Sequence, residues 1–474
     1  MPAHGVNIDR EIDPRIMLVY YSRLLRSRPP GRRALPPSRI PMRLFPTNTL
    51  LRHQTALAGA CLVLLAGCAG LPEGAAPTPA PASVQAGLDS ARFGQIDSAV
   101  NEAIGERRLP GAVFHLERDG AVYEQAYGRF SYEPDAAAVT PDTVFDAASL
   151  SKVLSTAPSV LLLAEEGKLD LEAKLVDYFP ECAGGGKEAI TIRHLLTHTS
   201  GLAAGLPARP AWSGDEAAHA LACAQAVTHA PGSFFRYSDI NYILLGQLVR
   251  KVSGMPLDAF AQERIFGPLG MRDTGYLPLR RIPAAAIAPT QRIAADAGGS
   301  LHGNSAGNSA GNSAGGLLQG VVHDPTVRRI GGVAGSAGVF TTARDVARFA
   351  RMLLGGGTMD GVRILGPDSV RLLTTVQSPP GIAALRGLGM DIDSPYALRP
   401  RGSLYPVGSF GHTGFTGCIL WIDPGSRSFY VLLSNRVYPD DKANVLPLYT
   451  RLGTLAAQAS GVSAQGAKTG TAAP

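Results

Sequence analysis

A serine and a lysine three positions apart are the residues of this sequence best suited to chemistry. The segment FDAASLSKVLST places Ser149 and Lys152 at the start of a long apolar run. Residues three apart share one face of a helix, so the amine can reach the hydroxyl. If burial lowers the pKa of the amine, it can take the serine proton, and a helix N-terminus favours the developing negative charge. The pair therefore predicts a nucleophilic serine; the alternative is that Ser149 caps the helix and Lys152 is solvated.

Two further segments supply groups that could complete such a site. Tyr237-Ser238-Asp239 precedes the amphipathic helix INYILLGQLVRKVSG, and His412-Thr413-Gly414 lies just before the expected strand CILWID. A tyrosine on a loop can carry a proton, and a glycine-containing strand edge can offer backbone donors. The alternatives are that Tyr237 is a core aromatic, that Asp239 is a helix N-cap, and that His412 is a turn residue.

Other apparent motifs do not predict sites. The repeat GNSAGNSAGNSAG contains Gly-x-Ser-x-Gly, but it lacks the strand and helix that make a nucleophile elbow, so residues 297–316 are expected to form a low-complexity surface loop. His194 and His198 are four apart without the glutamate or third ligand of a zinc protease. His323 and Asp324 are assigned to a loop. We expect neither a metal nor a cofactor.

The charge distribution argues against a nucleic-acid partner. Ten of the 44 basic residues but only three of the 38 acidic residues lie in residues 1–67, so the rest of the chain is nearly neutral. Within that basic segment, an apolar run from Ala56 to Ala66 is too short to span a membrane and has the length of a signal-peptide core. The alternative is a buried N-terminal helix.

The end of the apolar run, LAGC, resembles a bacterial lipobox, in which the cysteine, here Cys68, becomes the lipidated first residue. This resemblance implies a signal region over 1–67, with 1–41 an over-extended start, and a membrane partner through a lipid anchor. It also implies a periplasm-facing location, at the outer membrane in view of Ala69. In an oxidising compartment Cys182 and Cys223 could form a disulfide, but isolated thiols fit equally well.

The remaining chain is expected to form one α+β domain. A Pro/Ala tether over 68–92 leads to a domain over 93–457, followed by a disordered tail over 458–474. Hairpins are expected around Asp119-Gly120 and Pro424-Gly425, and residues 170–290 are largely helical in pattern. The helices expected from Phe93, over 149–166 and over 445–457 would cover an antiparallel sheet that carries an inserted, mainly helical domain.

The three motifs, in this order and spacing, resemble the serine β-lactamase and penicillin-binding-protein group, in particular its class C, D,D-peptidase and esterase-like branch. The motifs of that group are Ser-x-x-Lys, Tyr-x-Asn and Lys-Thr-Gly. The segments TIRHLLTHTSGL and GSAGVFTTARDVARFARMLL are also similar to its connecting segments. The resemblance covers residues 93–457 and implies a β-lactamase/transpeptidase-like fold.

The resemblance assigns a role to each motif residue. Ser149 would form an acyl-enzyme, with proton transfer shared by Lys152 and Tyr237, either of which could be the base. The backbone N–H groups of Ser149 and Phe415 would form the oxyanion hole. The strand from His412 would pair with the substrate backbone, which Gly414 would allow to approach closely. The substrate-binding residues would then be Asp239, His412, Thr413 and Gly414.

Two departures from the group's motifs affect the expected substrate. Asp239 replaces an asparagine, and His412 replaces a lysine, so the charge that would hold a substrate carboxylate is only partly present at neutral pH. Efficient penicillin hydrolysis is therefore not expected. We favour a serine hydrolase acting on cell-wall peptides as a D,D-carboxypeptidase. The alternatives are an esterase, a weak β-lactamase, or a catalytically silent module that binds penicillin or peptidoglycan.

Overall fold

The computed structural model describes residues 87–293 and 316–463. The signal region with Cys68, most of the tether, almost all of the low-complexity segment, and residues 464–474 of the expected tail lie outside the described residues. All of the described residues belong to one compact unit of the chain. In the described ranges, no helix has both the length and the apolar character needed to cross a membrane.

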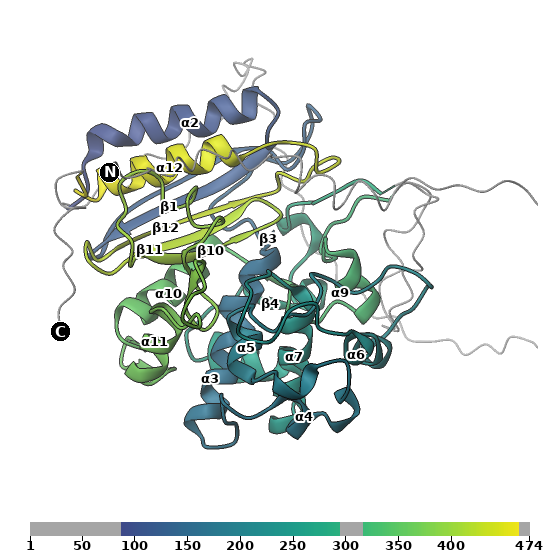
Figure 1. Cartoon of the computed structure of the whole chain (residues 1–474). Helices are drawn as coiled ribbons and strands as arrows, with labels where there is room; N and C mark the ends of the chain where they lie inside the picture. Colours follow the sequence, from purple (N-terminus) through teal and green to yellow (C-terminus); the bar gives the residue numbers. More distant parts are fainter. Residues whose placement is uncertain (1–86, 294–315, 464–474) are drawn as a thin grey trace, which may run out of the picture. The chain divides into compact units, whose positions relative to one another are not determined.

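A seven-stranded antiparallel sheet forms the centre of the domain (Figure 1). The first hairpin of the domain pairs with the last one, with Val113 opposite Leu433. The two hairpins expected around Asp119-Gly120 and Pro424-Gly425 are both confirmed. In spatial order the strands are β2 (Ala121–Gly128), β1 (Gly111–Arg118), β12 (Ser428–Ser434), β11 (Cys418–Asp423), β10 (Phe410–Gly414), β9 (Asp391–Asp393) and β8 (Leu385–Arg386).

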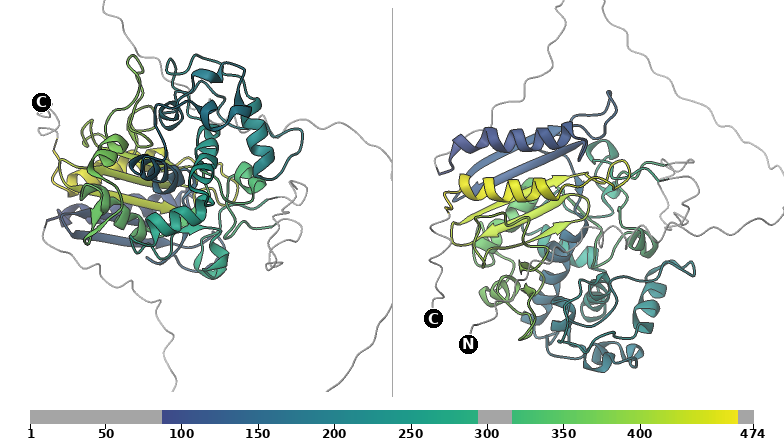
Figure 2. Two further views of the ribbon diagram at one scale, coloured as in Figure 1. Left: turned by 90° about the horizontal axis from the view of Figure 1, so that it is seen from below. Right: turned by 45° about the horizontal axis from the view of Figure 1, so that its top comes forward.

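The first and last helices of the domain cover one face of this sheet. Helices α2 (Phe93–Gly105) and α12 (Leu446–Ala459) lie side by side over the strands (Figures 1 and 2). Both belong to the hydrophobic cluster that contains Trp421 and Tyr430. The Asp89 N–H donates to the Ala459 carbonyl, 2.8 Å away, so the ordered fold starts a few residues before Phe93 and extends beyond the expected end at 457.

A mainly helical layer covers the other face, where Val113 and Val431 join a second, larger hydrophobic cluster. The α+β fold expected from the sequence is therefore confirmed. The helices of this layer are α3 (Ala157–Glu165), α4 (Leu175–Tyr178), α5 (Ile192–Leu196), α6 (Asp215–Ala224), α7 (Asp239–Ser253), α8 (Leu257–Ala261), α9 (Pro325–Ile330), α10 (Ala343–Leu354) and α11 (Pro367–Thr374). Small sheets pair β3 (Phe145–Asp146), β5 (Val339–Thr341) and β4 (Gly275–Tyr276), and β6 (Thr358–Met359) with β7 (Val362–Arg363).

The helix expected over residues 149–166 is irregular at its start. A 3-10 turn over Ala148–Leu150 and a π-helical turn over Lys152–Thr156 precede α3. Thr156 donates its hydroxyl to the Gly335 carbonyl at 2.8 Å, which ties the π turn to a distant loop. Such π turns are rare and concentrate at functional sites.

A disulfide joins Cys182 to Cys223, which confirms the pairing considered from the sequence. It links the 3-10 turn Pro180–Cys182 to α6, and both sulfurs belong to the helical layer. The third cysteine of the described domain, Cys418, is a buried free thiol in β11.

Removal of this disulfide should lower the stability of the domain. The two cysteines are 41 positions apart, and closing a loop of that length corresponds to about 4 kcal/mol of unfolding free energy. We expect Cys182→Ser with Cys223→Ser to lose about this amount in urea unfolding without reductant. Reduced, metal-free wild type should have the same unfolding free energy as the double variant. In the control Cys418→Ala, reduction should lower the unfolding free energy by as much as it does in the wild type. A double variant as stable as the oxidised wild type would contradict the prediction.

Candidate active site

Ser149 lies in a turn that the chain holds from both sides. The Asp146 carboxylate accepts the Ala148 N–H at 2.8 Å, and Ala148 has φ +46°, in the left-handed region. Ser151 donates its hydroxyl to the Ala148 carbonyl at 2.7 Å and accepts the Val339 N–H at 3.0 Å. Ser149 itself remains half-buried, so its hydroxyl is within reach of a substrate.

Lys152 joins the predicted site residues at one point. Its Nζ lies 3.1 Å from Ser149 Oγ and 2.8 Å from Asp239 Oδ1, and it donates to the Ser336 carbonyl at 2.7 Å. The Lys152 side chain is fully buried, so the alternative of a solvated lysine is wrong. Ser336 was not recognised as a site residue, although it belongs to the connecting segment GSAGVFTT.

The charge on Lys152 differs from the sequence-based expectation. Burial alone would lower the pKa of Lys152, but the Asp239 carboxylate and the hydrogen-bonded Tyr237 hydroxyl outweigh it and raise the pKa above its usual value. The condition under which Lys152 could take the serine proton, a lowered amine pKa, is therefore not met. At neutral pH the group is an ammonium, which donates to Ser149 Oγ.

Tyr237 faces the same point from the loop before α7. Its ring centre lies 5.0 Å from Lys152 Nζ, 4.4 Å from the His198 ring and 5.4 Å from the Tyr396 ring. The side chain is only half-buried and belongs to neither hydrophobic cluster, so it is not a core aromatic. Tyr237 therefore lies next to Lys152, where its hydroxyl could carry a proton.

His198 is a neighbour of the site that the sequence did not reveal. It follows α5 with φ +59°, it is buried, and its Nδ1 accepts the Ser238 N–H at 3.1 Å. Burial, together with the charges of Arg386 and Lys152, lowers the pKa of His198 well below its usual value, so the ring is neutral and supports Tyr237. His194 does not join it, because its Nδ1 accepts the N–H of Thr191 at the start of α5.

Asp239 is the first residue of α7, not its cap. Ser238 occupies the N-cap position, and the Asp239 carboxylate instead pairs with Lys152. The capping role considered for Asp239 is therefore wrong. About a third of its side chain, 31%, remains exposed, so the carboxylate also faces the solvent side of the site.

His412, Thr413 and Gly414 lie within strand β10, whereas the sequence placed them before a strand. Strand β9 pairs with β10 only at Gly411, so β9 leaves the edge from His412 to Gly414 uncovered. His412 Nδ1 lies 2.8 Å from the Thr413 carbonyl. Burial, and then Arg386 and Lys152, lower the pKa of His412 well below its usual value, so this position carries no positive charge at neutral pH.

The end of β10 packs directly against the nucleophile turn. A Cβ at Gly414 would lie 2.5 Å from the Ala147 carbonyl oxygen, so the packing of the chain itself requires glycine here. The reason expected from the sequence was instead the close approach of a substrate. Thr416 donates its hydroxyl to the Asp146 carbonyl at 2.6 Å. Phe415, between them, is thereby held next to the turn of Ser149, as an oxyanion hole built from these two residues requires.

Of the two residues that the sequence assigned to a loop, His323 is buried beside this site and Asp324 is half-buried. The His323 ring stacks on Phe415 with centres 5.6 Å apart, and the His323 N–H donates to Asp146 Oδ2 at 2.6 Å. Asp324 caps α9 by accepting the Val327 N–H at 2.8 Å. Burial, followed by the charge of Asp239, raises the pKa of Asp324.

An antiparallel sheet with a His-Thr-Gly strand, covered by a helical layer that carries a Ser-x-x-Lys turn and a tyrosine loop, defines a β-lactamase/transpeptidase-like protein. The family model described as Beta-lactamase matches residues 96–454, and this chain belongs to that family of serine hydrolases. The recognition made from the three motifs is therefore confirmed.

Relatives and solved structures agree with this assignment. A protein of Escherichia coli K12 named "Putative D-alanyl-D-alanine carboxypeptidase" is 28% identical over 377 residues, which span 74% of this chain and 84% of the relative. A penicillin-binding protein homologue from Caulobacter crescentus has a TM-score of 0.60 at 21% identity and covers 80% of this chain and all of its own. The hydrolase EstCE1 has a TM-score of 0.58 at 23% identity and covers 77% of this chain and 98% of its own. The two structures show the shared fold.

The Lys152–Asp239 ion pair leads to a pH prediction. In Asp239→Asn, Lys152 stays buried but loses the carboxylate that raises its pKa, so its ammonium should lose a proton at lower pH. We expect the alkaline limb of the kcat/KM profile for an activated ester to move down by about one pH unit or more. Asp258→Asn, an acidic residue of α8 outside the site, is the control. A profile that is unchanged in Asp239→Asn would show that the pair does not set the charge of Lys152.

Proposed function

We propose that this protein hydrolyses peptides that contain D-amino acids, through an acyl-enzyme on Ser149, with D,D-carboxypeptidase-type activity on cell-wall peptides. The observation that carries this proposal is the contact of Lys152 Nζ with both Ser149 Oγ and the Asp239 carboxylate. The named function of the carboxypeptidase relatives, 28 to 29% identical to this chain, supports the choice of substrate.

The geometry suggests how the proton moves. Lys152 is already an ammonium, so it orients Ser149 and stabilises negative charge, and the Tyr237 hydroxyl takes the serine proton as it passes its own proton to the leaving nitrogen. Ser149 Oγ then attacks the carbonyl carbon, whose oxygen is held by the N–H groups of Ser149 and Phe415. The C–N bond breaks as the leaving amine receives the proton, and a water molecule releases the acyl group by the same steps in reverse order.

A second candidate, ester hydrolysis or weak β-lactamase activity, is favoured by the uncharged state of His412. The position that would hold a substrate carboxylate in the resembling group has no cation here at neutral pH. An ester without a carboxylate does not need one. A third candidate, of another class, is a silent module that binds penicillin or peptidoglycan without turnover.

One panel of substrates separates these candidates. The full-length protein is incubated with an acyl-D-Ala-D-Ala peptide, a short-chain nitrophenyl ester and a fluorescent penicillin, each against Ser149→Ala. Release of D-alanine by the wild type alone supports the proposal. Ester cleavage without D-alanine release would identify the protein as an esterase. Rapid turnover of penicillin would identify it as a β-lactamase. Stable labelling by penicillin without any turnover, or no reaction at all, would leave the binding module.

We further propose that the protein acts in the bacterial cell envelope. A lipid anchor at Cys68 would hold it at the outer membrane, with its folded domain facing the periplasm. The support is the LAGC segment after an apolar run of signal-peptide length. In a bacterial host, Cys68→Ala should move the protein from the membrane fraction to the soluble fraction, whereas Cys418→Ala should not. Wild type that fractionates as soluble protein would contradict the anchor.

A further inference from the structure

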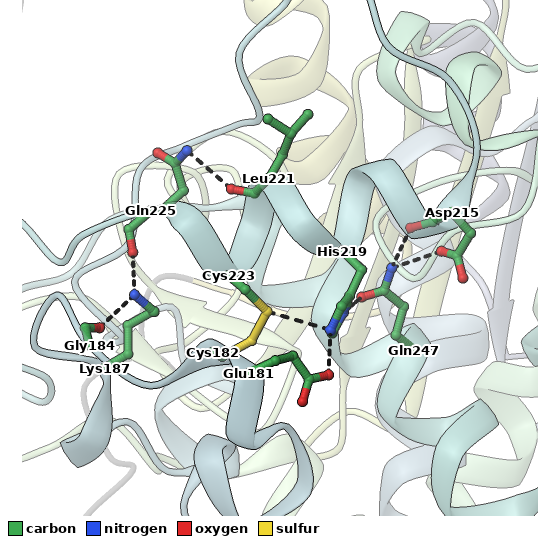
Figure 3. The surroundings of a disulfide bond; sticks show 10 residues. All are labelled: Glu181, Cys182, Gly184, Lys187, Asp215, His219, Leu221, Cys223, Gln225 and Gln247. Carbon is green, nitrogen blue, oxygen red and sulfur yellow. Dashed lines mark hydrogen bonds and ion pairs between the residues drawn. A yellow bond between two sulfur atoms is a disulfide. The ribbon is translucent and has the colours of Figure 1, made fainter.

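The disulfide of the helical layer has a histidine beside it. His219 lies one helical turn before Cys223 on α6, and its ring points at the sulfur pair (Figure 3). The ligand atoms of Cys182, His219 and Cys223 all lie within 4.8 Å of one another. Two sulfurs and an imidazole nitrogen are donors that Zn²⁺ favours.

The hydrogen bonds of His219 orient its ring so that Nε2 faces the sulfurs and the Glu181 carboxylate. Gln247 donates its amide N–H to Asp215 Oδ1 at 2.8 Å, so its Oε1 is left to accept from His219 Nδ1, also at 2.8 Å. His219 Nε2 lies 3.5 Å from Cys223 Sγ and 2.8 Å from Glu181 Oε1. Because a carboxylate oxygen only accepts, Nε2 donates its N–H to Glu181 in the disulfide form, and a bound cation would take the place of that proton. A ring nitrogen fixed in this way by a second hydrogen bond is typical of a metal ligand.

We propose that reduction of the Cys182–Cys223 disulfide creates a Zn²⁺ site, with Cys182, Cys223 and His219 as ligands and the Glu181 carboxylate as the fourth. The Sγ···Nε2 separation already fits, because bond lengths of about 2.3 Å to sulfur and about 2.05 Å to nitrogen place tetrahedral ligands roughly 3.5 Å apart. The observed distance from Cys223 Sγ to His219 Nε2 is 3.5 Å. The Glu181 side chain is 52% exposed and can adjust, and it opens the site to ions in solution.

The chemistry balances with a dithiol as the reductant. The dithiol breaks the S–S bond by thiol–disulfide exchange, supplies two electrons and two protons, and leaves as its own disulfide. Zn²⁺ then displaces the two thiol protons and the proton with which His219 Nε2 binds Glu181, and it is bound by the two thiolates and the nitrogen lone pair. The oxidised and zinc-bound forms exclude each other, yet both hold the Pro180–Cys182 turn against α6.

Cobalt and zinc titrations of the full-length protein test the proposal. Wild type reduced with a phosphine and freed of metal should bind one Zn²⁺ per chain, and Co²⁺ should give thiolate charge-transfer and tetrahedral absorption bands. Bound Zn²⁺ should also raise the Tm of the reduced protein. Oxidised wild type should show neither effect. Since the site contains none of Ser149, Lys152 and Tyr237, its outcome is independent of the proposed function.

Variants assign the ligands. His219→Ala should weaken Zn²⁺ binding by about tenfold or more and remove the tetrahedral cobalt spectrum, and Cys223→Ser should abolish binding. Glu181→Ala keeps both cysteines and the histidine and should weaken binding less. Cys418→Ala and His229→Ala, a buried thiol and an imidazole elsewhere, are the matched controls and should bind like wild type. Reduced wild type that binds no metal, or binding unaffected by His219→Ala and Cys223→Ser, would overturn the proposal.

Discussion

Ser149→Ala should abolish covalent labelling by fluorescent penicillin and lower kcat for any hydrolysed substrate by about 10³-fold or more. The half-buried Ser149 hydroxyl, 3.1 Å from Lys152 Nζ, is the proposed nucleophile, and the proposed acyl-enzyme cannot form without it. Intact-mass spectrometry after incubation with penicillin measures the adduct, and initial rates on the best substrate measure kcat.

A second serine on the same segment provides the control. Ser159 of α3 is also buried, but its hydroxyl donates to the Ser155 carbonyl at 2.7 Å and does not contact the site. Ser159→Ala should therefore keep labelling and kcat close to wild type. A Ser149→Ala protein that folds and still forms the adduct would exclude Ser149 as the nucleophile.

Lys152→Met should lower the acylation rate by about 10²- to 10⁴-fold, the second-largest effect expected. The substitution removes the ammonium from Ser149 and also leaves the Asp239 carboxylate without its partner. Stopped-flow measurement of acylation by an activated ester, normalised to folded protein, gives the rate. Because Asp239 loses its ion pair, Lys152→Met with Asp239→Asn should recover stability but not the rate.

Lys187 offers a matched control outside the site. It is another buried lysine, and its ammonium donates to the Gly184 and Gln225 carbonyls near the disulfide (Figure 3). Lys187→Met should reduce stability and leave acylation per folded molecule unchanged. If Lys152→Met acylates at the wild-type rate, proton transfer does not depend on the ammonium, and Tyr237 alone must carry it.

Four of the seven strands and the two terminal helices could be predicted because their signals are local. Apolar runs on either side of the turns at Asp119-Gly120 and Pro424-Gly425 define the hairpins, and periodic apolar residues define the helices at both ends. The spacing of Ser149 and Lys152 was informative for the same reason, since three positions along one chain segment fix their contact.

The features that the sequence did not reveal depend on distant segments. The raised pKa of Lys152 comes from Asp239 on another helix, and the neutral state of His412 from burial and from Arg386. His198 reaches Tyr237 only because the chain leaves α5 with φ +59°, which no residue pattern announces. The capping role for Asp239 was wrong because α7 begins at Asp239 itself, so the N-cap position falls on Ser238, whose side chain makes no capping hydrogen bond.

The central sheet joins the two ends of the domain, and this fixes when the molecule can become active. Strand β1 pairs with β12, and the turn of Ser149 is held by Gly414 and Thr416 at the end of β10. A chain still being synthesised can hold Ser149, Lys152 and Tyr237 long before β10 to β12 exist. Such non-local pairing forms late and slowly, so the nascent enzyme stays inert until almost its whole length has emerged.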